Sequence, residues 1–513
     1  MLSALIWVPL IGAALVGFWP GAMKPKSTRL VALVFAGVAF LWTVVLASQF
    51  NPGEVSQQFS EFIPWIEALG LNYHLGVDGL SLPLLVLNGL LTCIALYSSD
   101  EYVHRPRFYY ALVLVLNAGV AGAFLAQDLL LFFLFYELEL IPLYLLIAIW
   151  GGQRRGYAAT KFLIYTAISG ILILATFLGL VWLSGASSFA YEPSKAQALP
   201  IAEQILLLGA LLVGFGIKIP LVPFHTWLPD AHVEASTPIS VLLAGVLLKL
   251  GTYGLIRFGM GLFPLAWATL APALAAWAVV SVLYGSFTAI AQKDMKKMVA
   301  FSSIGHMGYV LLAAAAATPL STLASVLQMV SHGLISALLF LLVGVVYKKT
   351  GSRDIDVLRG LLNPERGMPL IGSMMVLGVM ASAGTPGMVG FISEFLVFRG
   401  SFPVFPTQTL VCMVGTGLTA VYFLNLLNRA FFGRLSEQVV NLPRVEWSER
   451  SPAAVLAVLI VILGLQPNWL VRWSEPMTTA MITNFPAIAS SALHEPLAPN
   501  NQSPTPPEEN RQW

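Results

Sequence analysis

The sequence has few charged residues for its length. Only 10% of its 513 residues are charged, whereas 57% are hydrophobic, and a soluble domain usually has about 25% charged residues. So little polar surface cannot cover a globule of this size, which excludes soluble dehydrogenases, nucleases and nucleic-acid-binding proteins. Lys and Arg number 27 and Asp and Glu number 25, so the net charge gives no reason to expect an anionic partner.

Cysteine is almost absent. Cys93 and Cys412 are far apart and lie in apolar segments. Two isolated thiols cannot provide the four ligands of an iron–sulfur cluster, and no CxxC pair with zinc-binding spacing is present. We therefore expect two small buried side chains, and no cofactor or metal held by this chain.

Long apolar runs dominate what is present. A membrane-spanning helix needs about 20 mostly apolar residues, and the first such run has no basic segment or small-residue cleavage site of a signal peptide, so we expect it to be retained. The sequence predicts an all-α polytopic membrane protein with about 14 transmembrane helices. These spans are expected near residues 2–20, 29–49, 80–98, 108–126, 128–150, 159–184, 204–222, 236–258, 265–291, 299–316, 321–347, 370–398, 408–431 and 453–470.

The basic residues indicate the orientation, because lysine and arginine are enriched in cytoplasmic loops. The loops after odd-numbered spans contain 20 of the 27 lysines and arginines, and the loops after even-numbered spans, together with the C-terminal tail, contain five. Both termini are therefore predicted on the side opposite the cytoplasm. The tail, residues 476–513, is expected to be partly disordered, because Pro496–Trp513 is rich in Pro, Asn, Gln and Glu.

Glycine and proline interrupt two of the predicted spans. The seventh contains Pro220 and Pro223, and the twelfth contains Gly384, Pro386 and Gly390, and such residues break the hydrogen bonds of a helix. Interrupted spans at corresponding positions are typical of inverted-repeat transporters. We predict two inverted five-helix repeats, residues 108–258 and 259–431, with a three-helix segment, 1–107, before them and a loop and last span, 432–475, after them.

Ionisable residues fall inside several predicted spans, where a charge costs on the order of 3 kcal/mol. Each can bind and release a proton once burial and a neighbouring charge change its proton affinity. A row of such groups through the middle of a membrane forms a proton relay. The predicted relay consists of Glu137, Lys218, Lys249, His306, His332 and Glu394.

Some of these residues have a second explanation. Glu137 and Glu139 are about 200° apart around a helix, so we assign Glu137 to the relay and Glu139 to an adjoining helix, a polar network or a partner subunit. Lys249 could instead extend to the membrane surface. His306 is expected near the start of the tenth span, beside the loop at 293–297, where it could be interfacial.

A further polar group follows the seventh span. His225, Asp230 and His232 are spaced like metal ligands, but no cysteine or third histidine accompanies them. We expect them to pack near the cytoplasmic entrance. Asp78 is expected to cap the third span at its N-terminus.

Five segments of this sequence resemble the antiporter-like subunits of respiratory complex I. They are Tyr136–Ile147, Lys218–His232, Leu247–Lys249, Ser303–Tyr309 and Gln328–Leu334, and the similarity covers about residues 70–435. Glu394, where most sister subunits have lysine, resembles the M-type group, and Glu137–Gly152 and Tyr157–Ala167 resemble the cyanobacterial and chloroplast branch, the photosynthetic NDH-1 complex. The segment from Val233 to Ser240 is more similar to the paralogue of CO2-uptake complexes.

This resemblance implies a function and a set of partners. Glu137 and Lys218 would be a coupled pair, Lys249, His306 and His332 would continue a polar axis, and Glu394 would end it. The chain would be a proton-translocating subunit of an NAD(P)H- or ferredoxin–quinone oxidoreductase in the thylakoid membrane. Iron–sulfur clusters and plastoquinone would belong to partner subunits, and the partners would be other membrane-arm subunits, lipids and, in a CO2-uptake form, a carbonic-anhydrase-like subunit.

Two alternatives remain open at this point. The same relay could serve a stand-alone cation/H+ antiporter of the multi-subunit antiporter type, which exchanges Na+ or K+. The chain could also be a structural membrane anchor whose charges have no function.

Overall fold

The computed structural model is a bundle of long helices, and it describes residues 1–21, 24–365, 367–436, 442–483 and 485. Eleven helices of this part of the chain are long and apolar enough to cross a membrane. Three shorter apolar helices, Ser3–Phe18, Leu82–Ser98 and Pro369–Ser382, occupy further predicted spans. The polytopic helical fold is therefore confirmed, whereas the number of fourteen spans stays a prediction.

The helices of the first half follow the predicted apolar runs closely. They are α1 (Ser3–Phe18), α2 (Pro25–Gln49), α3 (Leu82–Ser98), α4 (Pro106–Leu125), α5 (Leu129–Leu138), α6 (Leu140–Trp150), α7 (Arg155–Ser184), α8 (Pro193–Gln197), α9 (Ile201–Lys218), η2 (Phe224–Thr226), α10 (Trp227–Glu234), α11 (Thr237–Leu242), η3 (Leu243–Leu247), α12 (Leu248–Gly254) and η4 (Leu255–Met260).

The second half of the chain also consists of helices. Its helices are α13 (Pro264–Ile290), α14 (Met295–Ala316), α15 (Pro319–Thr350), α16 (Pro369–Ser382), α17 (Val389–Ser401), α18 (Pro406–Leu426), η5 (Leu427–Phe431), α19 (Trp447–Leu465) and α20 (Asn468–Thr483).

Both predicted helix interruptions are present. Pro220 and Pro223 lie between α9 and η2, and the loop with Gly384 and Pro386 separates α16 from α17. The fifth span has an interruption that the sequence analysis did not predict, since α5 ends at Leu138 and α6 begins at Leu140. Interrupted helices bring polar backbone and side chains into the middle of a membrane protein, where they line an internal path.

The eighth span is continuous but irregular. The segments η3 and η4 are π-helical, and they flank the short α-helix α12, which contains Lys249. π-Helical turns are rare and are frequent at functional sites. Periodicity of apolar residues could not predict them, because every residue of α12 and both π segments is buried.

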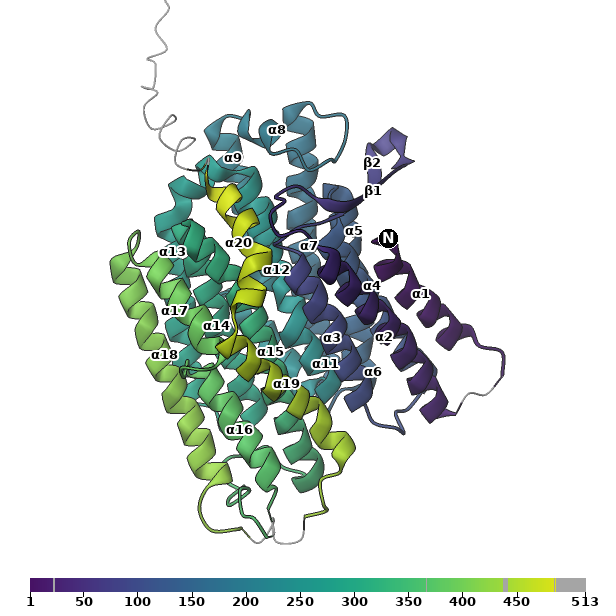
Figure 1. Ribbon diagram of the computed structural model, residues 1–513, viewed down its shortest axis with the longest axis vertical. Helices are drawn as coiled ribbons and strands as arrows, with labels where there is room; N and C mark the ends of the chain where they lie inside the picture. Colours follow the sequence, from purple (N-terminus) through teal and green to yellow (C-terminus); the bar gives the residue numbers. More distant parts are fainter. Residues whose placement is uncertain (22–23, 366, 437–441, 484, 486–513) are drawn as a thin grey trace, which may run out of the picture.

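The first 107 residues contain one β-hairpin that the sequence analysis did not predict, in addition to helices α1, α2 and α3. Strands β1 (Gln58–Ile66) and β2 (Leu71–Val77) form an antiparallel hairpin, joined by the short helix η1 (Glu67–Leu69). Gly70 ends this turn with a φ of 65°, which a residue without a side chain adopts readily. The hairpin projects from one end of the bundle, near the N-terminus (Figure 1).

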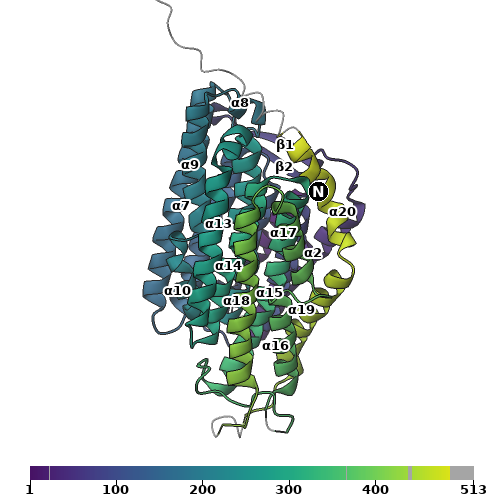
Figure 2. The ribbon, with the colours of Figure 1, turned by 90° about the vertical axis from the view of Figure 1, so that its left-hand side faces the viewer.

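Helix α15 is the central element of the second half. It packs against α14, α16, α17, α19 and α20. In its most apolar 18-residue segment, 94% of the residues are buried inside the protein. Figure 2 shows α14 and α15, which pack against each other, running along the long axis of the bundle.

The last helices differ from the prediction of one span and a tail beginning at residue 476. Helix α19 ends at Leu465, and α20 continues to Thr483 and lies against α15 and α3. The ends of α20 and of α1 that bear the termini lie toward the side of the hairpin (Figure 1). The expectation of disorder for Pro496–Trp513 concerns residues outside those that the structure describes.

Candidate functional site: a buried proton-transfer axis

Lys218, the last residue of α9, forms an ion pair with Glu139. Both side chains are inaccessible to solvent, with exposures of 2% for Lys218 and 0% for Glu139. Lys218 also lies 5.0 Å from the centre of the Tyr136 ring. Glu139 thus reaches an adjoining helix, which was one of the three alternatives predicted for it, and makes the direct contact with Lys218.

Glu137 lies in α5, just before the interruption at Glu139. It is half-buried, and its carboxylate packs against Gly170 of α7, where a Cβ atom would overlap with Oε1. It interacts electrostatically with Lys218, but it makes no ion pair among the described residues. The two glutamates therefore surround one lysine, Glu139 in contact with it and Glu137 at longer range.

Lys249 lies deep in the bundle and does not extend to the membrane surface. Its Nζ atom is 2.7 Å from Nδ1 of His332 on α15 and 2.5 Å from the carbonyl oxygen of Ala244. Lys249 is 0% and His332 4% exposed. Nε2 of His332 has no hydrogen-bond partner among the described residues, so this nitrogen is free to accept or donate a proton.

His306 and Glu394 continue the series. The rings of His306 and His332 have their centres 5.6 Å apart, and Nδ1 of His306 is 3.3 Å from Oε1 of Glu394. Glu394 Oε2 accepts a hydrogen bond of 2.9 Å from Thr416. The interfacial alternative for His306 is wrong, because α14 begins at Met295 and so places this histidine in the middle of the helix, buried.

A small cavity lies beside these groups. It has a volume of about 10 Å³, which is the space that one water molecule needs. Glu394, His306, His332 and several hydroxyl-bearing side chains line it. The lining residues are Ser302, His306, Gln328, Ser331, His332, Ile335, Ser336, Leu339, Ser382, Gly390 and Glu394.

The structure thus brings Lys249, His332, His306 and Glu394 into one continuous contact series. Lys218 and Glu139 form a second group. This group lies against the eighth span, because a Cβ atom on Gly251 of α12 would lie 3.2 Å from Cβ of Lys218.

The polar group after the seventh span is divided between several helices. Asp230 forms an ion pair of 2.8 Å with Lys161 of α7. His225 packs edge-on against Tyr284, with ring centres 4.7 Å apart. His232 stacks on Phe340 of α15 at 4.4 Å. No cluster of three or more potential metal ligands is found in the described part of the chain.

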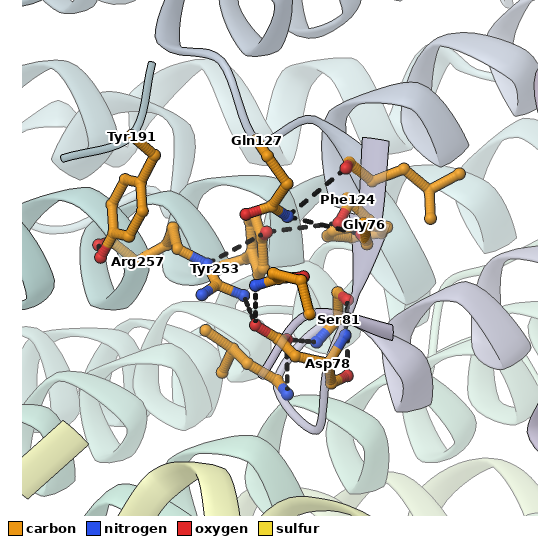
Figure 3. Close-up of polar contacts among 11 residues, drawn as sticks. Gly76, Asp78, Ser81, Phe124, Gln127, Tyr191, Tyr253 and Arg257 are labelled. Carbon is orange, nitrogen blue, oxygen red and sulfur yellow. Dashed lines mark hydrogen bonds and ion pairs between the residues drawn. The ribbon is translucent and has the colours of Figure 1, made fainter. Parts of the chain in front are cut away.

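A second buried ion pair was missed by the sequence analysis. Arg257 of η4, counted there as a loop residue, pairs with Asp78, and the two side chains are 2% and 1% exposed (Figure 3). Oδ1 of Asp78 accepts hydrogen bonds from the backbone N–H groups of Leu80 and Ser81, at 3.0 and 3.1 Å. These bonds lie in the turn before α3, whose N-cap is Ser81 and has no side-chain cap bond. The predicted cap of the third span by Asp78 is therefore wrong, and the ion pair is a role that the sequence did not predict.

Tyrosines surround the arginine of this pair. Nε of Arg257 donates to the hydroxyl group of Tyr253 at 3.3 Å, and the hydroxyl group of Tyr191 donates to the Arg257 carbonyl oxygen at 3.1 Å (Figure 3). Gln57 donates to Oδ2 of Asp78 at 2.7 Å. The pair ties the hairpin base, the loop before α8 and the eighth span together.

Lys296 is also buried, although the sequence places it in a basic loop. It lies in the first turn of α14 and is 5% exposed. Its Nζ atom donates to the carbonyl oxygen of Ala235 at 2.6 Å. Among the described residues, no carboxylate forms an ion pair with it.

Interrupted helices and buried ionisable groups in one helical bundle define a membrane protein that transfers protons or cations. The sequence matches the transmembrane NADH:quinone oxidoreductase/Mrp antiporter family over residues 126–419. This chain belongs to that family.

Individual relatives identify the subfamily more closely than the family match does. The chain is 40% identical over 512 residues to NAD(P)H-quinone oxidoreductase chain 4 1 of Synechococcus sp. (strain JA-3-3Ab), covering 97% of this chain and 96% of that protein. It is 41% identical over 458 residues to NAD(P)H-quinone oxidoreductase chain 4-2 of Synechocystis sp. (strain ATCC 27184 / PCC 6803 / Kazusa), covering 88% and 81% of the two chains. Both relatives are similar to this chain over most of their length.

Solved structures share the fold. A chain of respiratory complex I from Thermus thermophilus superposes with a TM-score of 0.85 at 26% identity, covering 95% of this chain and all of that one. A chain of the Mrp complex from Dietzia sp. DQ12-45-1b gives a TM-score of 0.85 at 20% identity, covering 95% and 99%. The second likeness concerns the fold alone.

Proposed function

We propose that this chain is the proton-translocating membrane-arm subunit of a complex I-like NAD(P)H- or ferredoxin–quinone oxidoreductase. One observation carries the proposal: Lys249, His332, His306 and Glu394 form a contact series inside the bundle. Buried ionisable groups that contact one another in this way can pass a proton between them. The names of the relatives at about 40% identity support the coupling to quinone reduction.

The geometry supports a specific sequence of proton transfers. A protonated Lys249 can donate to Nδ1 of His332 at 2.7 Å. His332 then releases a proton from Nε2 toward His306 through the small cavity, and Nδ1 of His306 passes a proton to Glu394 at 3.3 Å. Each step moves one proton from a donor to an acceptor, and the imidazoles recover by exchanging their tautomers.

Lys218 and Glu139 would drive this series electrostatically. When the carboxylate of Glu139 or Glu137 is protonated or moves, the charge of Lys218 loses its counter-charge. The unbalanced positive charge of Lys218 would then favour loss of the proton of Lys249, which lies in α12 with Gly251, because electrostatic interactions are strong in a medium of low polarity. Energy released by redox chemistry in other subunits would enter the chain here.

The redox groups would belong to partner subunits. We place iron–sulfur clusters and plastoquinone in those subunits, and the chain itself among other membrane-arm subunits and lipids in a cyanobacterial thylakoid membrane, with both termini in the lumen. The segment from Val233 to Ser240 favours a CO2-uptake form with a carbonic-anhydrase-like partner. Identification of the proteins that co-purify with the tagged chain tests each of these statements.

The test of the central proposal is a proton-to-electron ratio. The purified complex is reconstituted in liposomes, and proton transport is measured during quinone reduction for the Lys218→Ala variant. We expect a lower yield of assembled complex, because Glu139 loses its counter-charge, and the complex that does assemble should reduce quinone without normal proton transport. A normal ratio in this variant would exclude the relay.

The antiporter alternative predicts a different result. A chain that purifies alone and exchanges Na+ or K+ for protons in liposomes would be a secondary antiporter. The likeness to the Mrp chain concerns the fold, so it does not favour this function over the first.

A further inference from the structure

A vestibule opens at the end of the bundle opposite the hairpin. Its volume is about 530 Å³, and its wall includes Glu234, Lys296, Tyr347 and Arg353. Most lysines and arginines of the loops lie on this side of the predicted topology. No group of the relay proposed above lines this vestibule.

Lys296 is the buried cation of the vestibule wall. Among the described residues, its Nζ atom donates one hydrogen bond, to the Ala235 carbonyl oxygen, and the charged groups around it are Arg353, Asp294 and Glu234. Arg353 and Asp294 form an ion pair with each other at 3.2 Å. Glu234 accepts a hydrogen bond from the backbone N–H of Arg154 at 2.9 Å. No ion pair therefore fixes Lys296 in its charged form.

His232 lies three residues before Ala235 and is 0% exposed. Neither of its ring nitrogens has a hydrogen-bond partner among the described residues. Buried polar atoms are nearly always hydrogen-bonded to protein or water, so two free nitrogens on one ring indicate water or a proton path. The charged groups that act on His232 are Lys296 and Lys249.

Helix α15 gives the relative depth of these groups. Tyr347, Gly344 and Val343 line the vestibule, Phe340 stacks on His232, and Leu339, Ser336 and His332 line the small inner cavity. A helix rises 1.5 Å per residue, so the ring of His232 lies about one helical turn from Ser336. Along α15, His232 thus lies between the vestibule and the small cavity lined by His332, the partner of Lys249.

We propose that Lys296 and His232 form an inlet that delivers protons from the vestibule to Lys249. Water in the vestibule gives a proton to the neutral amine of Lys296. Lys296 passes it, directly or through water, to one nitrogen of His232, and the other nitrogen releases a proton toward Lys249. Lys249 then loses its proton to His332, so both lysines return to their starting state, and His232 recovers by exchanging its tautomer.

This inference rests on the proposed function, and the experiment separates the two. The complex is reconstituted in liposomes, and the rate of proton transport during quinone reduction is measured for Lys296→Arg, His232→Gln and Lys249→Met. Arginine can keep the hydrogen bond to Ala235, but it stays protonated and does not release a proton. We therefore expect Lys296→Arg to assemble and to lower proton transport by about 100-fold, the lower range for loss of a proton-transfer group.

The matched control is Lys297→Met, one residue further along α14, where the lysine is half-exposed. It is expected to transport protons at the normal rate. The Lys296→His variant keeps a group that can transfer protons but titrates near pH 6.5, so we expect it to restore transport with a pH profile shifted to lower pH.

The outcomes are distinct. Normal transport by Lys296→Arg, with transport lost in Lys249→Met, would overturn the inlet and leave the proposed function standing. Normal transport by Lys249→Met would overturn the proposed function itself. Loss of transport in Lys297→Met as great as that in Lys296→Arg would also overturn the inlet, because it would show an effect of basic charge in general.

Discussion

The amine of Lys218 contacts the carboxylate of Glu139, whereas Glu137, two residues earlier, packs against Gly170. The two glutamates of this segment therefore have different surroundings, one fully buried in an ion pair and one half-buried. Their variants should fail in different ways.

Glu139→Gln should destabilise the protein. The substitution leaves the buried charge of Lys218 without its counter-charge, and breaking a buried ion pair costs about 3–5 kcal/mol. We expect a lower yield of assembled complex and a lower midpoint of thermal unfolding. The matched variant Glu137→Gln removes no ion pair, so it should assemble normally and lose proton transport. Equal stability of the two variants would contradict the assignment.

Gly170→Ala tests the position of Glu137 without changing any charge. A Cβ atom at this position would overlap with Glu137 Oε1, so the carboxylate must move. We expect normal assembly with proton transport reduced toward that of Glu137→Gln. Gly209→Ala is a suitable control, because a Cβ atom there meets nothing within 4 Å. Unchanged transport in Gly170→Ala would show that the location of Glu137 has no importance.

His332→Gln tests the contact with Lys249. Glutamine can accept the hydrogen bond of 2.7 Å but cannot take up a proton. Transport should fall by about 100-fold or more, as is usual for loss of a proton-transfer group, while quinone reduction continues in the partner subunits. His225→Gln, at a histidine outside the contact series, should keep its transport. The ratio of protons to electrons in both variants decides the question.

The ion pair of Asp78 and Arg257 is expected to serve stability. Asp78→Asn should destabilise the chain by about 3–5 kcal/mol, because Arg257 remains buried without its counter-charge. The double variant Asp78→Leu with Arg257→Met removes both charges and should recover much of that loss. Thermal unfolding of the purified complexes measures both effects. A double variant as unstable as the single one would contradict this explanation.

The effect of Asp78→Asn should depend on pH in a defined direction. Burial raises the pKa of Asp78, which lies outside the helical spans, but Arg257 and the donors of Ser81 and Gln57 outweigh burial and hold this pKa below its usual range. The stabilisation is therefore present above the unfolded-state pKa of about 3.9 and is lost as the pH falls through the folded-state pKa. Between pH 5 and 8 the difference between wild type and variant should stay constant.

The helices and the interrupted spans could be predicted because apolar runs, glycine and proline determine them locally. The hairpin could not, since Gln58–Val77 contains no long apolar run and its strands are stabilised by pairing with each other. The helix α20 was missed for a related reason: its polar residues lower its hydropathy, and its buried side chains, such as Leu470 and Ile482, only become evident through packing.

The site was predicted in part. Lys218, Lys249, His332, His306 and Glu394 are buried, as expected of residues within long apolar runs. Their roles in proton transfer stay predictions. The assignment of Glu137 to the relay stays a prediction. The ion pair of Glu139 with Lys218 could not be predicted, because the angle of about 200° assumes a continuous helix and the helix is interrupted at Glu139.

Lys296 and Arg257 were missed because both lie in terminal turns of their spans. A basic residue at such a position usually extends to the membrane surface. Here other segments cover the helix ends: Ala235 lies over Lys296, and the loop with Asp78 lies over Arg257. Contacts between segments distant in sequence cannot be inferred from one chain without a structure.

Helices α19 and α20 cross the outer side of α15 like a strap, from one end of the bundle to the other (Figure 1). Hydrocarbon chains of the lipid are thereby kept away from the helix that holds His332. A proton that moves along the relay near His332 is therefore surrounded by protein. Helices α19 and α20 separate it from the lipid, and their loss would expose the charged relay to the bilayer.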